Sequence, residues 1–203
     1  MSKRAEISDV ELERFRRLGY LLRAWPSPDG SKGRIYVRIE LEDPSAHPYF
    51  LHDKSTTVRD LRVRLRSARG REWCQLAGKV LREARPDDSV FFIPIQQIQG
   101  RWEQLSEYVG SMREFWLWLL GVWNQPASRN GYRSFDSLLA RFWKAQGFST
   151  WTTNALLHSG IRSWADIEPL TRTDLLKLPY LGKGGVTRIE ELLNLRRPAK
   201  PIV

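Results

Sequence analysis

The sequence predicts an α+β protein of two domains: a small basic α/β domain over residues 1–125 and an all-helical domain over residues 135–203. Three observations predict this division. The stretch "RIYVRIELE" alternates apolar and polar residues, as a half-buried strand does. Residues 101–123 repeat apolar residues at helical spacing, and from residue 135 onward short helical patterns are separated by Gly, Ser and Thr. A chain of 203 residues is long enough for two small cores.

The first expected element is a helix over residues 8–25. Ser8 and Glu11 form a capping-box pattern, in which each side chain accepts a backbone N–H of the other residue. The apolar residues that follow recur at helical spacing. Two prolines and two glycines in "PSPDGSKG", residues 26–33, then predict a loop.

Two strands are expected in the N-terminal domain. Residues 34–42 place four apolar side chains on one face, whereas "SVFFIPI", residues 89–95, is apolar on both faces and has Pro94 near its end. The buried face of the first strand would comprise Ile35, Val37, Ile39 and Leu41.

The segment between these strands, "TTVRDLRVRLRSARG", fits two interpretations. Leu61, Val63 and Leu65 alternate with arginines as in a strand, but Val58, Leu61, Leu65 and Ala68 also fit a helix. Residues 71–84 are expected to be helical in part. The stretch "CQLAGKVLREARPDDSVFFIPI" has a loose resemblance to the end of a ubiquitin-like β-grasp fold.

A single long helix is expected over residues 101–123. Its seam residues recur at alternating steps of three and four, as in a coiled coil or a tightly packed helix pair. A core position or a homo-oligomer contact through this helix explains the seam, and Trp118 lies off it as a candidate partner surface. The seam residues are Trp102, Leu105, Val109, Met112, Trp116, Leu119 and Trp123, and the candidate partner interface comprises Trp116, Trp118 and Trp123.

The net charge of +10 favours a polyanionic partner, because neutralising phosphates releases condensed counterions. Residues 55–85 carry nine Arg or Lys and three acids, which gives that window a charge of +6. A run of arginines on one face there is a second candidate nucleic-acid surface, although an ordinary solvated face is the alternative. Its members are Arg59, Arg62, Arg64, Arg66 and Arg69.

The stretch "LPYLGKGGVTRIEELL", residues 178–193, predicts a helix–hairpin–helix. A glycine loop there would leave backbone N–H groups free for a phosphate, next to the positive end of a second helix starting at Val186. Glycine would allow close approach and a positive φ. The candidate DNA contacts are Asn154, Gly182, Lys183, Gly184, Gly185, Thr187 and Arg188.

Residues 153–196, "TNALLHSGIRSWADIEPLTRTDLLKLPYLGKGGVTRIEELLNLR", resemble the C-terminal domain of the bacterial RNA polymerase alpha subunit, and the similar region extends over about 135–197. The resemblance implies a helix–hairpin–helix fold that contacts the minor groove of A·T-rich DNA through Asn154, Gly182 and Lys183. Two features depart from the family. Trp151 stands where the family has an arginine, and Gly184-Gly185 replace its usual Lys-Ser pair. Nothing before residue 134 resembles that subunit. The residue pattern itself predicts that Trp143, Trp151 and Trp164 fill the core of the helical domain.

Catalytic and metal-binding patterns find little support. The histidines are scattered, and no cysteine joins them in a zinc-ligand spacing. Asp87-Asp88 follow Pro86 and suggest a turn, while Cys74 is interpreted as a packed thiol. We therefore expect no catalytic residue, no metal and no cofactor. The histidines considered are His47, His52 and His158.

These patterns predict a non-enzymatic protein that binds nucleic acid, with duplex DNA favoured over RNA, in transcription regulation or a mobile-element nucleoprotein complex. One alternative is an adaptor that docks RNA polymerase or another complex subunit through the helical domain and the Trp-rich helix. A second alternative is a nuclease or nuclease accessory. No apolar run reaches the length of a membrane span. The single cysteine, Cys74, suits a reducing compartment, so a cytoplasmic, nucleoid-associated protein is expected.

Overall fold

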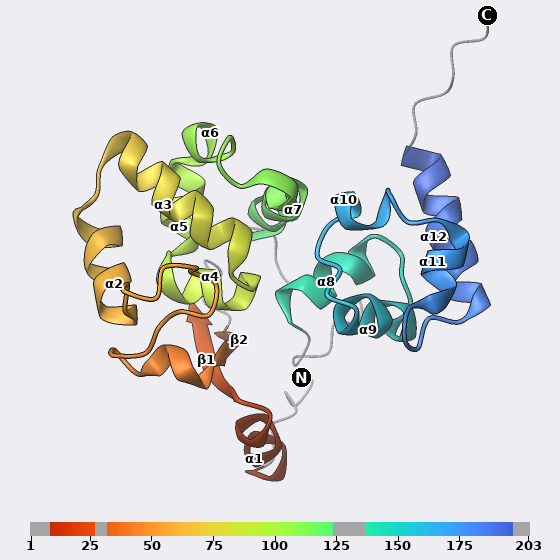
Figure 1. Cartoon of the computed structure of the whole chain (residues 1–203), viewed down its shortest axis with the longest axis horizontal. Coiled ribbons are helices and arrows are strands. Elements are labelled where there is room, and N and C mark those ends of the chain that lie inside the picture. The colour runs from red at the N-terminus through yellow and green to blue at the C-terminus, as the bar shows by residue number, and fades with distance from the viewer. Residues whose placement is uncertain (1–8, 27–31, 124–136, 197–203) are drawn as a thin grey trace, which may run out of the picture. The chain divides into compact units, whose positions relative to one another are not determined.

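The computed structural model describes residues 9–26, 32–123 and 137–196, and the chain divides into two compact units (Figure 1). Unit 1 comprises Met1–Leu138 and unit 2 comprises Leu139–Val203. The described elements are mostly helices, with one antiparallel pair of strands in unit 1, so the expected α+β class is confirmed. The loop over residues 124–134, where the sequence places the domain junction, lies outside the described residues.

The first helix is shorter than the sequence predicts. Helix α1 (Asp9–Arg17) is followed by Gly19 at φ +80°, whose N–H donates to the carbonyl oxygen of Arg16 at 2.9 Å. This left-handed conformation suits glycine and turns the chain out of the helix. The expected continuation to residue 25 is therefore wrong, because Tyr20–Pro26 form strand β1. Ser8 and the side chain of Glu11, the expected cap, lie outside the described residues.

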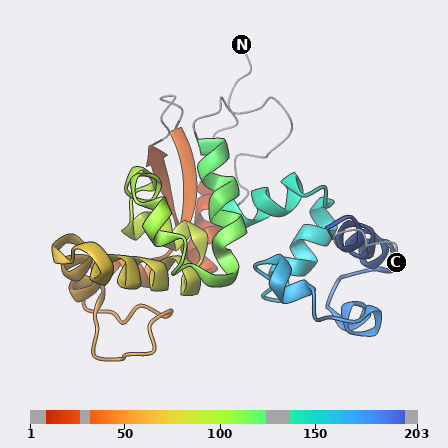
Figure 2. The ribbon, with the colours of Figure 1, turned by 90° about the horizontal axis from the view of Figure 1, so that it is seen from above.

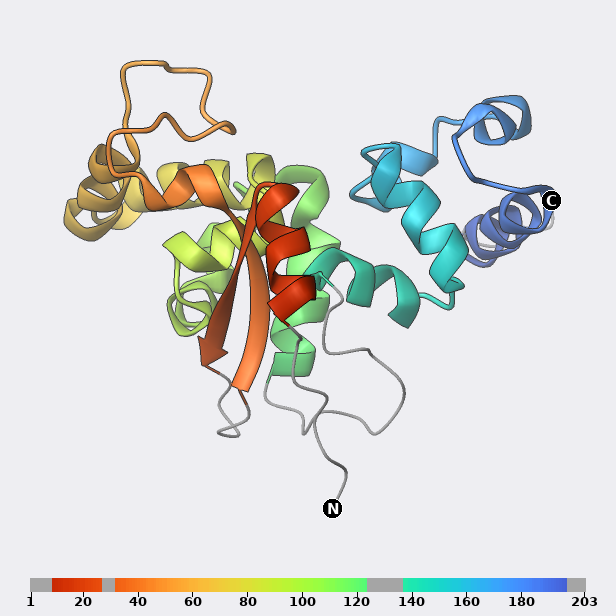
Figure 3. The ribbon, with the colours of Figure 1, turned by 90° about the horizontal axis from the view of Figure 1, so that it is seen from below.

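Strand β1 pairs antiparallel with strand β2 (Lys32–Arg38), and Figures 2 and 3 show the two strands side by side. The strand expected over residues 34–42 is confirmed up to Arg38, after which Ile39–Glu42 form the short 3₁₀ helix η1. Ile35, Val37 and Leu41 are buried as predicted, whereas Ile39 is exposed in η1, and Tyr36 is buried too. The ring centroids of Tyr36 and of Phe15 in α1 lie 4.7 Å apart, so α1 contacts the face of β2 that was expected to be polar.

The segment after this hairpin is helical, which settles the ambiguity in the sequence. Helix α2 (Val58–Ser67) buries Val58, Leu61 and Leu65 on one face and begins at a capping box between Thr57 and Asp60. Helix α3 (Gly70–Glu83) confirms the expectation for residues 71–84. The indole Nε1 of Trp73 donates to the carbonyl oxygen of Leu65 at 3.1 Å and ties the two helices together.

The second expected strand, residues 89–95, is wrong. Helix α4 (Pro86–Phe92) starts with proline in its first turn, and Pro94 precedes helix α5 (Ile95–Gly100). Two acids follow Pro86, and acids stabilise the positive end of a helix, so a helix start outweighs the strand-like composition. With only β1 and β2 in its described part, unit 1 does not have the β-grasp topology.

The Trp-rich region forms two helices with a break, not one long helix. Gly110, at φ +53°, lies in the short 3₁₀ helix η2 (Gly110–Met112), which separates α6 (Trp102–Leu105) from α7 (Arg113–Trp123). The middle of the predicted seam is nevertheless buried in unit 1. Its buried members are Leu105, Val109, Met112, Trp116 and Leu119.

Unit 2 is built from short helices, as the sequence predicts for this region. Phe142, Trp143, Phe148 and Trp164 form its aromatic core, with the rings of Trp143 and Trp164 5.4 Å apart. Ser149 and Thr171 cap two of the helices through their hydroxyls. The helices are α8 (Leu138–Ala145, whose first residue belongs to unit 1), α9 (Thr150–His158), α10 (Trp164–Ile167), α11 (Arg172–Lys177) and α12 (Lys183–Arg196).

Across the described ranges, no helix combines the length and the apolarity needed to cross a bilayer.

Candidate nucleic-acid interface

The hairpin between α11 and α12 begins its second helix earlier than the sequence suggests. The expected start was Val186, but α12 begins at Lys183, and the N–H of Val186 already donates to the carbonyl oxygen of Gly182 at 3.1 Å. Lys183, Gly184 and Gly185 are therefore the first turn of the helix, not a loop. The N–H groups of a first turn have no acceptor within their own helix and carry the positive end of its dipole.

The strained residue of the turn is a tyrosine, not a glycine. Tyr180 adopts φ +65°, whereas Gly182, Gly184 and Gly185 have ordinary negative or extended φ values. The expectation that these glycines supply a positive φ is therefore wrong. Tyr180 stacks on the ring of His158, with 5.3 Å between centroids and 15° between planes, while Leu181 is buried.

The three glycines have different surroundings. A Cβ added at Gly185 would lie 2.7 Å from Cδ1 of Leu181 and 3.2 Å from the hydroxyl oxygen of Thr152, so packing inside unit 2 requires a glycine there. A Cβ added at Gly182 or Gly184 would meet no atom within 4 Å. Neither packing nor φ explains the glycines at these two positions.

Contact between Gly185 and Thr152 places the first turn of α12 beside the start of α9. Asn154 is exposed on α9, as its predicted role requires. Trp151, expected to fill the core of the helical domain, is instead 80% exposed. Residues three apart on a helix share a face, so Trp151 and Asn154 are neighbours on the surface of α9.

Lys183 and Arg188 differ in their freedom to meet a ligand. Arg188 donates from Nη1 to Glu191 at 3.0 Å, and its Nη2 lies 3.1 Å from the place that a Cβ would take on Gly147. Lys183 is exposed, and none of the ion pairs among the described residues of unit 2 involves it. Thr187 is also exposed. Among the described residues, Lys183 is therefore a cation of this surface without an ion-pair partner.

Of the five arginines predicted as a second surface, three share one face of α2. Arg59 and Arg66 are exposed, and Arg62 lies between them with its guanidinium 4.8 Å from the ring centroid of Phe91. Arg69 instead donates from Nη1 to the carbonyl oxygens of the three residues before it, at 2.6 to 2.9 Å, and so completes the end of α2.

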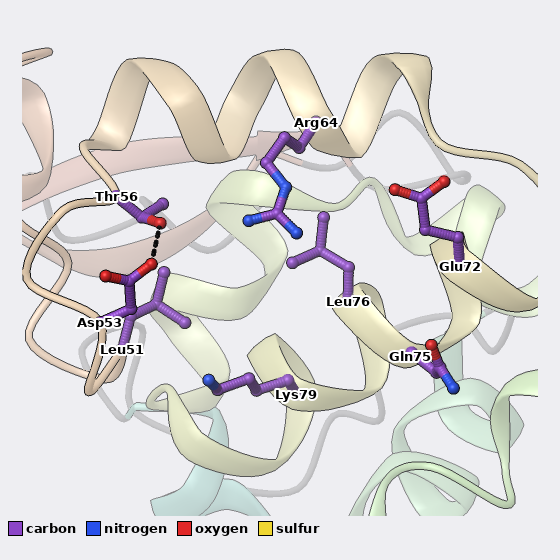
Figure 4. A pocket seen from close by; sticks show the side chains of 8 residues that line it. All are labelled: Leu51, Asp53, Thr56, Arg64, Glu72, Gln75, Leu76 and Lys79. Carbon is purple, nitrogen blue, oxygen red and sulfur yellow. Dashed lines mark hydrogen bonds between the residues drawn. The ribbon is translucent and has the colours of Figure 1, made fainter.

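The fifth arginine, Arg64, faces a hollow of about 230 Å³ between α2, α3 and the loop before α2 (Figure 4). Both signs of charge line it. Asp53 accepts hydrogen bonds from Ser55 and Thr56, and the Ser55 hydroxyl is the largest cause that lowers the pKa of Asp53 to about 2. The lining residues are Leu51, Asp53, Thr56, Arg64, Glu72, Gln75, Leu76 and Lys79.

The predicted tryptophan interface is divided. Trp116 is fully buried, and its Nε1 donates to the carbonyl oxygen of Leu81 at 3.0 Å, so it belongs to the core of unit 1. Trp118 is half-buried, with its ring 5.9 Å from that of Phe115. The side chain of Trp123 lies outside the described residues. Leu117, which the sequence did not single out, is an exposed apolar residue on α7.

Asp87 and Asp88, interpreted as a turn, are buried carboxylates at the start of α4. Asp88 accepts the backbone N–H of Arg38 at 2.9 Å and the hydroxyl of Tyr49 at 2.8 Å. Asp87 accepts the backbone N–H of Tyr36 at 3.2 Å, so the pair holds α4 against β2. Burial raises the pKa of both carboxyls.

The groups of unit 1 considered for catalysis have different surroundings. His47 lies with Nδ1 3.2 Å from the carbonyl oxygen of Thr56, His52 is exposed, and Cys74 is a buried free thiol. The described residues contain no group of three or more His, Cys, Asp or Glu side chains that could hold a metal ion.

Comparisons with protein-family models, with curated proteins and with solved structures found no significant match to this chain.

Proposed function

We propose that the chain binds DNA without chemistry of its own, through contacts to the sugar–phosphate backbone made by the start of α12. Gly182, Lys183 and Gly184 would meet the phosphates, and Asn154 on the adjacent helix would contact the same strand. The exposed arginines of α2 in unit 1 would add sequence-independent affinity.

The observation that carries this proposal is the pair of open glycines. Glycine within a helix costs about 0.5–1 kcal/mol relative to alanine, and here neither φ nor packing requires it. Gly184 is such a position, whereas Gly182 precedes the helix, and the two glycines flank the exposed Lys183 at the start of a helix of 14 residues. A phosphate group approaching backbone N–H groups needs the space that a Cβ would fill.

Charge around the hairpin supports the same ligand class. Residues 149–165, which include α9, and residues 175–189, which include the turn of the hairpin and the first half of α12, contain cations and no acid. The acids that do lie on α11 and α12 are paired: Glu190 with Arg172, Glu191 with Arg188, and Asp174 with Lys177. The hairpin therefore has a local excess of positive charge.

The test is a salt titration of binding between the full chain and a labelled DNA duplex. We expect the affinity to fall steeply with salt, and Lys183→Glu to weaken binding about tenfold and to reduce the salt slope by about 1. Lys177→Glu is the matched control, because Lys177 is exposed but already lies 3.6 Å from Asp174. Unchanged affinity of Lys183→Glu would remove the hairpin from the interface.

The arginine face of α2 is tested separately by a double variant, Arg59→Glu with Arg66→Glu. Both side chains are exposed, whereas Arg62 covers Phe91 and its replacement would disturb packing.

Binding that is insensitive to salt would favour the adaptor alternative, and metal-dependent breakdown of the labelled duplex would favour the nuclease alternative.

A further inference from the structure

We propose that the DNA surface of unit 2 recognises an unpaired base, which stacks on the exposed indole of Trp151. The ligand class is then single-stranded DNA, or duplex DNA with a gap, bulge or frayed end. This inference rests on the proposed function, because it assigns a base to a surface whose phosphate contacts are already proposed there.

The placement of Trp151 is the first argument. Its side chain is 80% exposed, whereas Trp143 and Trp164 of the same unit are buried and in ring contact with each other. Burying an indole is strongly favourable, so a ligand that covers this side chain would gain affinity from it. The core of unit 2 is complete without it.

The second argument is what surrounds the indole. Asn154 lies on the same face of α9, and the contact of Thr152 with Gly185 brings the first turn of α12 alongside. An amide, a lysine and an aromatic ring are thus grouped on two adjacent helix starts. Their combination is typical of single-strand binding, in which cations follow the backbone and aromatic rings stack on bases.

Charge decides between a nucleic acid and an apolar protein partner. The segments that form this surface, residues 149–165 and 175–189, carry no acid, and Lys183 has no ion-pair partner among the described residues. An apolar partner would gain nothing from that cation, whereas a polyanion would.

Stacking geometry decides between unpaired and paired bases. The flat face of an indole stacks on the face of a base, and in an intact duplex those faces are covered by neighbouring base pairs. A strand end, a gap or a bulge uncovers them at a cost smaller than opening a pair. Trp151 therefore adds affinity only where a base is unstacked.

The experiment measures fluorescence anisotropy of the full chain with three labelled probes: a single strand, an intact duplex, and the same duplex with a short single-stranded gap. We expect Trp151→Ala to weaken binding to the single strand and to the gapped duplex about tenfold and to leave the intact duplex nearly unchanged. Trp151→Phe should keep most of the binding, because phenylalanine also stacks.

A matched control is Leu195→Ala, which removes an equally exposed apolar side chain, 79% accessible, near the other end of α12. It should change none of the three affinities. Thermal unfolding of each variant should match that of the unaltered chain, because neither side chain is buried.

Failure of the stacking inference and failure of the proposed function would give different results. Equal or absent losses on all three probes for Trp151→Ala, with Lys183→Glu still weakening binding, would overturn the stacking inference and leave the proposed function standing. If Lys183→Glu has no effect on any probe, the proposed function fails together with the inference.

Discussion

The packed contacts around α3 in unit 1 and the exposed surface of α9 and α12 in unit 2 use glycine and tryptophan in opposite ways. In unit 1, Gly78 lies so close to Tyr108 that an added Cβ would be 2.3 Å from the Cβ of that residue, and Trp73 and Trp116 are buried with each indole N–H satisfied. In unit 2, Gly182 and Gly184 face open space and Trp151 faces solvent. A residue whose type is explained by internal contacts informs us about folding. Gly100 and Gly121 of unit 1 are open as well, so a residue without an internal reason is a candidate for ligand contact only where other groups suited to that ligand lie beside it.

The largest expected effect concerns the packed glycine of unit 1. Gly78→Ala would force α3 away from Tyr108, since the added Cβ would also lie 2.9 Å from the backbone oxygen of that residue. Backbone cannot move aside as a flexible side chain can, so we expect a loss of about 2–3 kcal/mol in the free energy of unfolding. Urea unfolding monitored by circular dichroism measures it. A stability within experimental error of the unaltered chain would contradict the close packing.

The buried Asp88 of unit 1 and the capping Asp174 of unit 2 differ in how their contributions to stability depend on pH. Burial raises the pKa of Asp88, so the folded state holds its proton more tightly than the unfolded chain does, and the contribution of Asp88 to stability falls as pH rises from about 4 through that raised value. Asp88→Asn removes this titration. We therefore expect the variant to lose about 1–2 kcal/mol at acidic pH, from impaired hydrogen bonding, and less as pH rises.

Asp174 in unit 2 is the control of opposite sign. Its capping interaction with the hydroxyl of Thr171 lowers its pKa, so its stabilising effect is present above the unfolded pKa and is lost as pH falls through the folded one. The stability difference between the unaltered chain and Asp174→Asn should therefore grow with pH, whereas that for Asp88→Asn should shrink. Urea unfolding at a series of pH values compares the two, and parallel trends would contradict the assigned environments.

The sequence predicted local elements better than long-range contacts. It located α3, β2 and the hairpin of unit 2, because these depend on periodicity and turn residues close in the chain. It left α2 open, since Leu61 and Leu65 fit both periods. It failed at residues 89–95, because the helix start at Pro86 and its two acids was interpreted as a turn; the contacts of these acids with β2, about 50 residues away, could not be predicted from any local pattern.

The candidate site shows the same limit. The exposed Lys183 and the open glycines were predicted as a group, because they are contiguous in the chain. Trp151 was assigned to the core, since an aromatic residue type does not reveal which way its side chain points. Two features of the sequence indicate the orientation of Trp151. Ser149 caps α9 and so determines where the helix begins, and the candidate contact Asn154 lies three residues after Trp151 on the same helix. Together they place Trp151 on the face of the predicted site.

The smallest expected effect concerns the open Gly184 of unit 2, where one substitution should raise stability and lower DNA affinity. Gly184→Ala adds a Cβ that meets nothing in the protein, so we expect α12 to be stabilised by up to about 0.5–1 kcal/mol. The same Cβ would keep a phosphate from the first-turn N–H groups, so we expect DNA affinity to fall several-fold. Gly185→Ala should instead lower stability, since its Cβ would press on the buried Leu181 at 2.7 Å. Thermal unfolding and anisotropy on the same samples measure both quantities. Unchanged affinity with increased stability would show that Gly184 serves no ligand, and the open glycines would then lose their value as evidence for a binding surface.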